Sequence, residues 1–193
     1  MVNVVRQART EQVKEAARAL GFDAVGVAAA GPADKDERFL QWLKAGYAGT
    51  MTYMADAADA RRHPHQRVPG ARSVVVVAMS YYQPDAVRDE KEGPLRVSRY
   101  CRSDDYHTVM KKRVRRLRRV LLQIDPDAIA APTVDTSPVL ERYWAHQAGI
   151  AWIGKSAMAI GTRLGTYDRG PEVHRAQRRR HPAAASEGTP AAL

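Results

Sequence analysis

The stretch Ser73–Met79, SVVVVAM, constrains the fold of this chain more than any other segment. Its β-branched residues follow one another without polar alternation, and a short run of this kind predicts a strand. Because the side chains of a strand point alternately to its two faces, an unbroken apolar run needs cover on both faces. The segment therefore predicts the central strand of a small sheet flanked by helices, in an α/β (α+β) domain.

A long helix over about residues 105–124 is the next clearest element. Its apolar residues recur three and four positions apart, which is the spacing of one buried helix face. The stripe consists of Tyr106, Val109, Met110, Val114, Leu117, Val120 and Leu121. The opposite face carries Lys111, Lys112, Arg113, Arg115, Arg116, Arg118 and Arg119.

The net charge of +10 and the pI near 10 give this basic face a meaning. A basic surface favours polyanionic partners, nucleic acid first, and a row of cations with few acids beside it suits phosphate contacts. We expect Lys111, Lys112, Arg115, Arg116 and Arg119 to contact RNA. A solvated helix face, a generally basic proteome or a basic tail would explain the same charge without a partner.

Weaker patterns predict the remaining elements. Thr10 is a plausible N-cap for a helix that ends near Gly21, and residues 22–27 alternate as a short strand does. Residues 37–48 have helical spacing of apolar side chains. A further helix is expected from Ser137, as N-cap, to about Gln147, with Pro138 in its first turn.

The composition excludes several classes of protein. Cys101 is the only cysteine, so the chain can form no internal disulfide and cannot by itself ligate a 4Fe–4S cluster, which needs several thiolates. No window approaches eighteen uninterrupted apolar residues, and the charged N-terminal segment lacks the apolar centre of a signal peptide. We expect a cytoplasmic protein without a membrane span.

The character of the sequence changes at Asp168. Residues 168–193 are rich in Arg, Ala and Pro, with no Ile, Phe, Met, Tyr or Trp. Such a segment cannot bury enough apolar area to offset the entropy of ordering it. The prediction is one domain over residues 1–167, incomplete at its C-terminal end, and a disordered tail over residues 168–193.

Asp135 is the main candidate for chemistry. Since Ser137 and Pro138 account for the start of the following helix, Asp135 stands upstream of the cap at the end of a predicted strand. Ligands bind at such strand ends in open α/β sheets, and a partly desolvated carboxyl there could act as a general acid. The alternative is an Asx-turn or a second capping group, which position alone favours.

Other polar residues are less specific. Arg142 could clamp a phosphate, although a surface ion pair is the commoner role, and His107 reads most simply as a helix-entry residue. Lys155 follows Gly154 in a turn that lacks the glycine spacing of a P-loop. His63 and His65 have neither the spacing nor the neighbours of a metal site. No protein-ligated metal is predicted.

Four ordered motifs resemble the N-terminal, cobalamin-binding region of the epoxyqueuosine reductases. They are RRHP with VPGARS in residues 61–73, SRYCRSDDYH in residues 98–107, VDTSPVLER in residues 134–142 and QAGIAWIGK in residues 147–155. The resemblance covers roughly residues 8–167. Four motifs in the same order are much more specific than any one of them.

The resemblance implies a fold, a reaction and a set of site residues. The family reduces the epoxide of epoxyqueuosine at the wobble position of certain tRNAs, using base-off cobalamin and electrons from two 4Fe–4S clusters. Asp135 corresponds to the proton donor. Cobalamin contacts are implied for Arg61, Ser98, Asp135, Arg142, Ser156 and Ala159.

The chain departs from the family after Tyr167, where the cluster-binding cysteines would follow. The change looks like a truncated or frame-shifted product, or a natural stand-alone half, and it leaves the electron donor unknown. Two alternatives to a reductase stay open. One is a non-catalytic, basic RNA-binding remnant, and the other is an enzyme of another cobalamin- or flavin-dependent reductive class.

Overall fold

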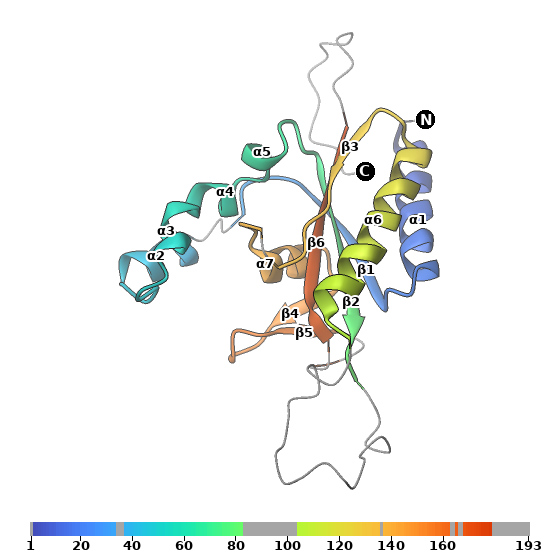
Figure 1. The fold of residues 1–193 in the computed structure, drawn as a ribbon. Helices are drawn as coiled ribbons and strands as arrows, with labels where there is room; N and C mark the ends of the chain where they lie inside the picture. Colours follow the sequence, from blue (N-terminus) through green and yellow to red (C-terminus); the bar gives the residue numbers. More distant parts are fainter. Residues whose placement is uncertain are drawn as a thin grey trace, which may run out of the picture.

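The predicted central strand is confirmed in a computed structural model of the chain, which describes residues 2–33, 37–82, 104–135, 137–162, 165 and 168–178. The strand is β2, Ser73–Ser80, and it lies inside a four-stranded sheet of order β1-β2-β6-β3 (Figure 1). All three pairings in this sheet are antiparallel. The other strands are β1 (Ala24–Ala29), β3 (Ala128–Ala131) and β6 (Asp168–Arg178).

Alternate residues of β2 belong to two separate cores. Val75 and Val77 point to the face covered by α1 (Val2–Ala19) and α6 (Tyr106–Ile124), which lie side by side in Figure 1. The apolar stripe of α6 packs here, with Met110, Val114, Leu117 and Leu121 all buried. The apolar stripe of α6 therefore covers one of the two apolar faces of β2.

The opposite face of the sheet is covered by smaller elements. Val74, Val76 and Ala78 of β2 pack there against α7 (Glu141–Gln147) and against the hairpin of β4 (Ala151–Ile153) and β5 (Ala159–Gly161). The backbone of α7 comes close to the sheet at Gly26, where an added Cβ would lie 2.3 Å from the Ala148 carbonyl oxygen. Only glycine permits this approach, which fixes the position of α7.

Four short helices fill the connection between β1 and β2. They extend to one side of the sheet (Figure 1) and are α2 (Arg38–Lys44), α3 (Thr52–Asp56), α4 (Ala58–Arg62) and α5 (Pro64–Arg67). The last of them starts with Pro64 at the first helical position, where its missing N–H costs nothing. This connection carries Arg61 to the same side of the sheet as α7.

Two predicted helix starts are corrected. The first helix begins at Val2 rather than at Thr10, whose hydroxyl donates to the Arg6 carbonyl oxygen at 2.9 Å inside the helix. The last helix begins at Glu141, with Leu140 rather than Ser137 at the cap position. A residue such as Thr10 can cap a helix or bond the backbone inside one, so its presence does not fix where a helix starts.

The structure also differs from the expected tail over Asp168–Arg178. This segment forms β6, which pairs with β2 on one side and with β3 on the other. Backbone hydrogen bonds on both edges hold such a strand, and a prediction from apolar content does not count them. The rest of the predicted tail, residues 179–193, lies outside the described residues.

No helix in the described part of the chain combines the length and the apolar character needed to cross a membrane.

The antiparallel sheet removes one of the reasons for expecting chemistry at Asp135. The expectation for Asp135 assumed the strand ends of an open α/β sheet, whereas β3 ends at Ala131, four residues before Asp135. The site therefore has to be judged by its own contacts.

Candidate active site

Asp135 lies in the connection between β3 and α7 with a left-handed backbone, at a φ of 55°. A residue with a side chain adopts this region at a cost of about 1–2 kcal/mol, which Asp tolerates better than most. The neighbouring residues hold the connection in place, because Thr133, Val134 and Val139 are all buried. The side chain of Asp135 itself is 52% exposed. The protein thus presents this carboxyl to solvent on a firmly anchored loop.

The N-terminal end of α6 binds the Asp135 carboxyl. The Tyr106 hydroxyl donates to Oδ2 at 2.9 Å, and Nε2 of His107 lies 3.0 Å from the same oxygen. The two rings are packed together, with centroids 4.0 Å apart. Asp105, the N-cap of α6, accepts the backbone N–H of His107. The helix start and the Asp135 loop therefore form one polar cluster.

Glu141 places a second carboxyl beside the first. Its Oε1 accepts the backbone N–H of Asp135 at 3.1 Å, and its side chain is half-buried. Burial, with the charge of Asp135 added to it, raises the pKa of Glu141 to about 7, against the lowering effect of the Asp135 amide and of Arg142 and Arg61. Near neutral pH the site thus holds a carboxyl that is partly protonated.

Two arginines approach this pair of carboxyls from different elements. Arg61, at the end of α4, has its guanidinium 5.9 Å from the centroid of the Tyr53 ring. Its Nε is buried and has no hydrogen-bond partner within the described residues. Arg142 donates Nη1 to the carbonyl oxygen of Ala157 in the β4–β5 turn. The charges of Arg61, Arg142 and Asp135 all act on Glu141, so the structure brings together three residues that the family resemblance assigned to one site.

The other predicted cofactor contacts are placed less closely. Ser156 is exposed in the β4–β5 turn, next to the residue that Arg142 binds. Ala159 is 7% exposed and belongs to the core between the sheet and α7. Ser98 lies outside the described residues, as does Cys101. These assignments stay predictions.

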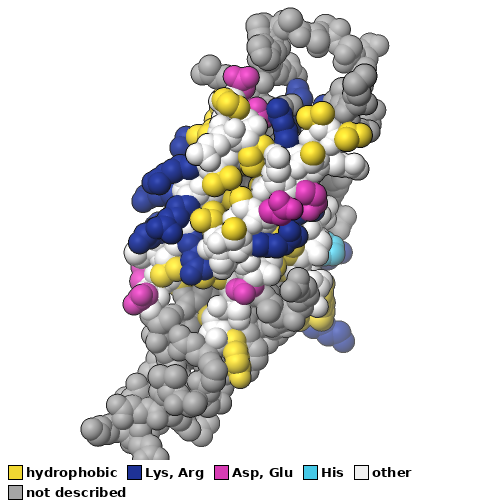
Figure 2. Space-filling model, turned by 90° about the vertical axis from the view of Figure 1, so that its right-hand side faces the viewer, with side chains coloured by type: hydrophobic (Ala, Val, Ile, Leu, Met, Phe, Trp, Pro, Cys, Tyr) yellow, Lys and Arg dark blue, Asp and Glu magenta, His cyan; other side chains and the backbone are white. Residues whose placement is uncertain are grey.

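The basic face of α6 begins one turn beyond this cluster. Lys112, Arg115, Arg116 and Arg119 are exposed and Lys111 is half-buried. Lys and Arg side chains gather along one side of the α1–α6 face in Figure 2. Arg113 and Arg118 have structural roles instead, since they donate to the carbonyl oxygens of Gly21 at 2.6 Å and Ala130 at 2.9 Å. Neither Arg113 nor Arg118 was among the residues expected to contact RNA.

Sequence reasoning missed the roles of Tyr106 and Glu141 and took His107 for a helix-entry residue. The signal in the sequence was the Asp105-Tyr106-His107 triplet at a predicted helix start. The next motif then supplies two acids, Asp135 and Glu141. The contact joins residues 28 positions apart, which a pattern within one segment cannot show. Within the described ranges, no three His, Cys, Asp or Glu side chains group as a metal site.

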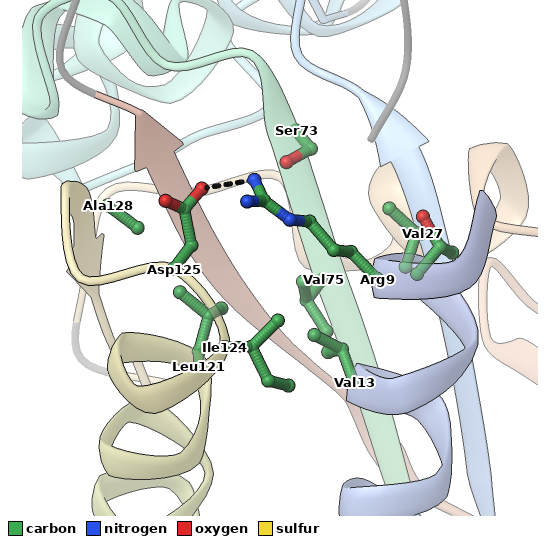
Figure 3. A pocket seen from close by; sticks show the side chains of 10 residues that line it. Arg9, Val13, Val27, Ser73, Val75, Leu121, Ile124, Asp125 and Ala128 are labelled. Atoms are coloured by element: carbon green, nitrogen blue, oxygen red, sulfur yellow. Dashed lines mark hydrogen bonds and ion pairs between the residues drawn. The ribbon is translucent and has the colours of Figure 1, made fainter. Parts of the chain in front are cut away.

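A small apolar cavity lies at the other end of α6, between the sheet and α1 (Figure 3). Val13, Val75 and Leu121 line it, and an ion pair of 3.2 Å between Arg9 and Asp125 crosses its polar side. Its volume of about 30 Å³ has room for one or two water molecules but not for a cofactor. We take the cluster around Asp135 as the candidate site, because polar side chains from α6 and α7 meet at this loop.

Comparisons with known proteins agree with the motif resemblance. A family model described as "Epoxyqueuosine reductase QueG, DUF1730" matches residues 61–136. An epoxyqueuosine reductase from Gloeobacter violaceus is 44% identical over 158 residues, which cover 81% of this chain and 48% of that protein. The chain spans about half the length of the curated relatives it matches. The predicted resemblance to this family is confirmed.

Solved structures show the same fold. An epoxyqueuosine reductase from Bacillus subtilis, described with its aspartate catalytic loop swung out of the active site, has a TM-score of 0.74 and 22% identity. A reductase solved with an epoxyqueuosine-modified tRNA-Tyr stem loop has a TM-score of 0.72 and 23% identity. The two alignments cover 96% and 95% of this chain, and 49% and 48% of those chains.

Proposed function

From this confirmed resemblance to the epoxyqueuosine reductases, we propose that the chain carries the proton-donating half of an epoxide-reducing site that acts on tRNA. Asp135 is the donor. Opening an epoxide leaves negative charge on its oxygen, and a positioned carboxylic acid can protonate that oxygen as the charge develops. The observation that carries the proposal is the exposed Asp135 carboxyl on an anchored left-handed loop, oriented by Tyr106 and His107.

Two further observations support Asp135 in this role. Asp135 is the aspartate of Val134-Asp135-Thr136, which corresponds to the VD-S/T motif of the family and keeps its place in the order of the motifs. The Bacillus subtilis structure, which shares the fold, is described by an aspartate catalytic loop. The Glu141 carboxyl accepts the backbone N–H of Asp135 and so holds the loop in place. Glu141 therefore positions the carboxyl of Asp135.

Cobalamin fits the residues around this cluster. Arg61 has a buried Nε without a described acceptor, and cobalamin offers amide and phosphate oxygens. Trp152 and Met158, on the hairpin that Arg142 contacts, are 50% and 54% exposed and offer an apolar surface for a flat ring. Arg61, Arg142, Ser156 and the edge of the hairpin at Ala159 would hold the cofactor. When bound, it would supply the reducing electrons.

Iron–sulfur clusters do not fit these residues. Cys101 is the only cysteine among the 193 residues, and a cluster needs several thiolates. The described residues assign no route for electrons into the site. We therefore limit the role of this chain to binding, orientation and proton transfer.

A tRNA stem fits the basic face of α6. Lys112 follows His107 by five residues, which is about 7.5 Å along the helix axis, so the row of cations starts next to the Asp135 cluster. A backbone held by Lys112, Arg115, Arg116 and Arg119 would bring one end of the RNA to Asp135. A cytoplasmic location, expected from the sequence, suits this partner.

The proposal can be tested in a single turnover. The purified chain is given cobalamin, a chemical reductant and an RNA stem loop that carries epoxyqueuosine, and the product nucleoside is measured. Asp135→Asn should slow the reaction by about 10²–10⁴-fold while cobalamin and RNA binding change less than about twofold. An Asp135→Asn variant that reacts as fast as the wild type would contradict the assignment.

The second candidate function is RNA binding without catalysis. The exposed cations of α6 favour it, because they would bind a stem loop whether or not a reaction follows. Salt-sensitive RNA binding by the wild-type chain, without a cobalamin spectrum and without product, would select this candidate over the reductase.

A further inference from the structure

Asp105, His107 and Asp135 lie in a row at the start of α6. The imidazole of His107 stands between the two carboxyls, with Nδ1 3.0 Å from Asp105 Oδ1 and Nε2 3.0 Å from Asp135 Oδ2. Both ring nitrogens thus have a carboxyl oxygen at hydrogen-bond distance. The His107 side chain is 31% exposed, so the row also reaches solvent.

The number of hydrogens in this row is limited. A neutral imidazole has one N–H, so it can donate to one carboxylate and must turn a lone pair toward the other. Asp105 is the side that needs the donor. It already accepts the backbone N–H of His107 and the Thr108 hydroxyl. The backbone bond, followed by the bond to the His107 side chain, holds the pKa of Asp105 below its usual value.

The His107 hydrogen on Nδ1 therefore belongs to Asp105, and the bond between Nε2 and Asp135 needs a second proton. That proton can sit on Asp135, as a carboxylic acid donating to Nε2, or on Nε2, as an imidazolium donating to a carboxylate. The two forms differ only by a proton transfer across 3.0 Å. The Tyr106 hydroxyl donates to the same Asp135 oxygen.

We infer that His107, oriented by Asp105, loads Asp135 with its proton and is a positioning and proton-relay residue of the site. This inference rests on the proposed function. The proton shared by Asp135 and His107 Nε2 sits on Asp135 when Asp135 gives it to the substrate oxygen, and Nε2 then takes one proton from solvent, which restores the shared proton. One proton passes from solvent to the substrate, and no electron moves through the row.

Several charged groups face this row and share its electrostatic field. Asp104 and Tyr106 adjoin it on the start of α6, and Glu141 of α7 reaches it through the Asp135 amide. The positive charges of Arg61 of α4 and Arg142 of α7 act on Glu141. The substitutions that test the inference are therefore limited to Asp105, His107 and Asp135.

The position of the hydrogens can be measured without cofactor or substrate. The ¹⁵N chemical shifts of His107 in the full 193-residue chain, assigned by comparison with His107→Gln, report which ring nitrogen is protonated. We expect a hydrogen on Nδ1 in the wild type and a mixture of tautomers in Asp105→Asn. A wild-type ring with its hydrogen on Nε2 alone, or no change in Asp105→Asn, would overturn the inference.

The relay is tested by the buffer dependence of the single-turnover rate at fixed pH and ionic strength, in a buffer that does not bind cobalt. The wild-type rate should not depend on buffer concentration. His107→Ala should be at least about tenfold slower in dilute buffer, and its rate should rise with the concentration of buffer acid. A His107→Ala rate equal to that of the wild type would overturn the relay.

The two proposals fail in different ways. If Asp135→Asn keeps its rate, the proposed function fails at its donor. If Asp135→Asn is inactive while His107→Ala and His107→Gln, both folded by circular dichroism, keep the full rate, the donor stands and the relay is wrong.

Discussion

An aspartate lies next to each end of α6, and the two aspartates differ in burial and in bonding partner. At the C-terminal end, Asp125 is 11% exposed and pairs with Arg9 beside an apolar cavity (Figure 3). At the N-terminal end, Asp135 is 52% exposed and is bonded by Tyr106 and His107. An arginine is always charged and offers a fixed counter-charge, whereas an imidazole can gain or lose a proton.

The difference shows how a residue type acquires a role from its surroundings. Asp125 caps a helix and ties α1 to α6, so its charge contributes to the stability of the fold. Asp135 lies on a loop that is strained but anchored, next to a histidine that reaches solvent. Strained, exposed and exchangeable groups are typical of reactive sites.

The largest expected loss of stability tests the Asp125 side of this comparison. Asp125→Asn should lower the free energy of unfolding by about 1–3 kcal/mol, because it leaves the partly buried Arg9 without its counter-charge. Denaturant unfolding at neutral pH measures the effect. The exposed Asp56→Asn is the matched control and should stay within about 0.5 kcal/mol of the wild type. Equal losses in the two variants would remove the structural role of Asp125.

A pH-dependent effect of similar or smaller size is expected at Glu141. Burial and the charge of Asp135 raise the pKa of Glu141 in the folded protein from its ordinary value of 4.5 to about 7. The folded state then binds more protons than the unfolded state between these values, so stability falls as pH rises through this window and levels off above it. Because the side chain is half-buried, we expect a loss of about 1–3 kcal/mol rather than the full shift.

Glu141→Gln isolates this effect. The variant removes the titrating group and keeps a side-chain oxygen that can accept the Asp135 amide. Its stability relative to the wild type should rise between pH 4.5 and 7 and stay constant from there to pH 8. A difference that does not change over this range would mean that Glu141 is not desolvated in the folded protein.

The smallest expected effect concerns the basic face of α6. Arg116→Gln should weaken binding of an RNA stem loop about two- to fivefold and lower the slope of log affinity against log salt by about 0.7–1. Arg67→Gln removes the same charge from an exposed position on α5 and should leave both values unchanged. Equal effects of the two substitutions would show that net charge, rather than this helix face, attracts the RNA.

The sequence was sufficient where one physical signal dominated. The apolar run of β2 predicted a strand with two covered faces, and the stripe of α6 predicted a helix that the structure ends at Ile124. Asp135 was separated from the helix cap by reasoning about the next residues, and this conclusion holds although the cap is Leu140 rather than Ser137.

Other features could not be predicted because they depend on distant partners. The strand β6 is held by hydrogen bonds to β2 and β3, which its own composition does not reveal. The bond between His107 and Asp135, and the one between the Asp135 amide and Glu141, require three segments to be folded together. Thr10 could cap a helix or bond back inside one, and only the preceding turn decides between these roles.

The most direct test of the account measures turnover and stability of the same two variants, Asp135→Asn and Asp125→Asn. We predict that Asp135→Asn loses turnover by about 10²–10⁴-fold and keeps the unfolding free energy of the wild type within about 1 kcal/mol. Asp125→Asn should lose stability and, at a temperature where it is folded, keep its turnover. The opposite pattern, with Asp135→Asn destabilised but active, would contradict the account.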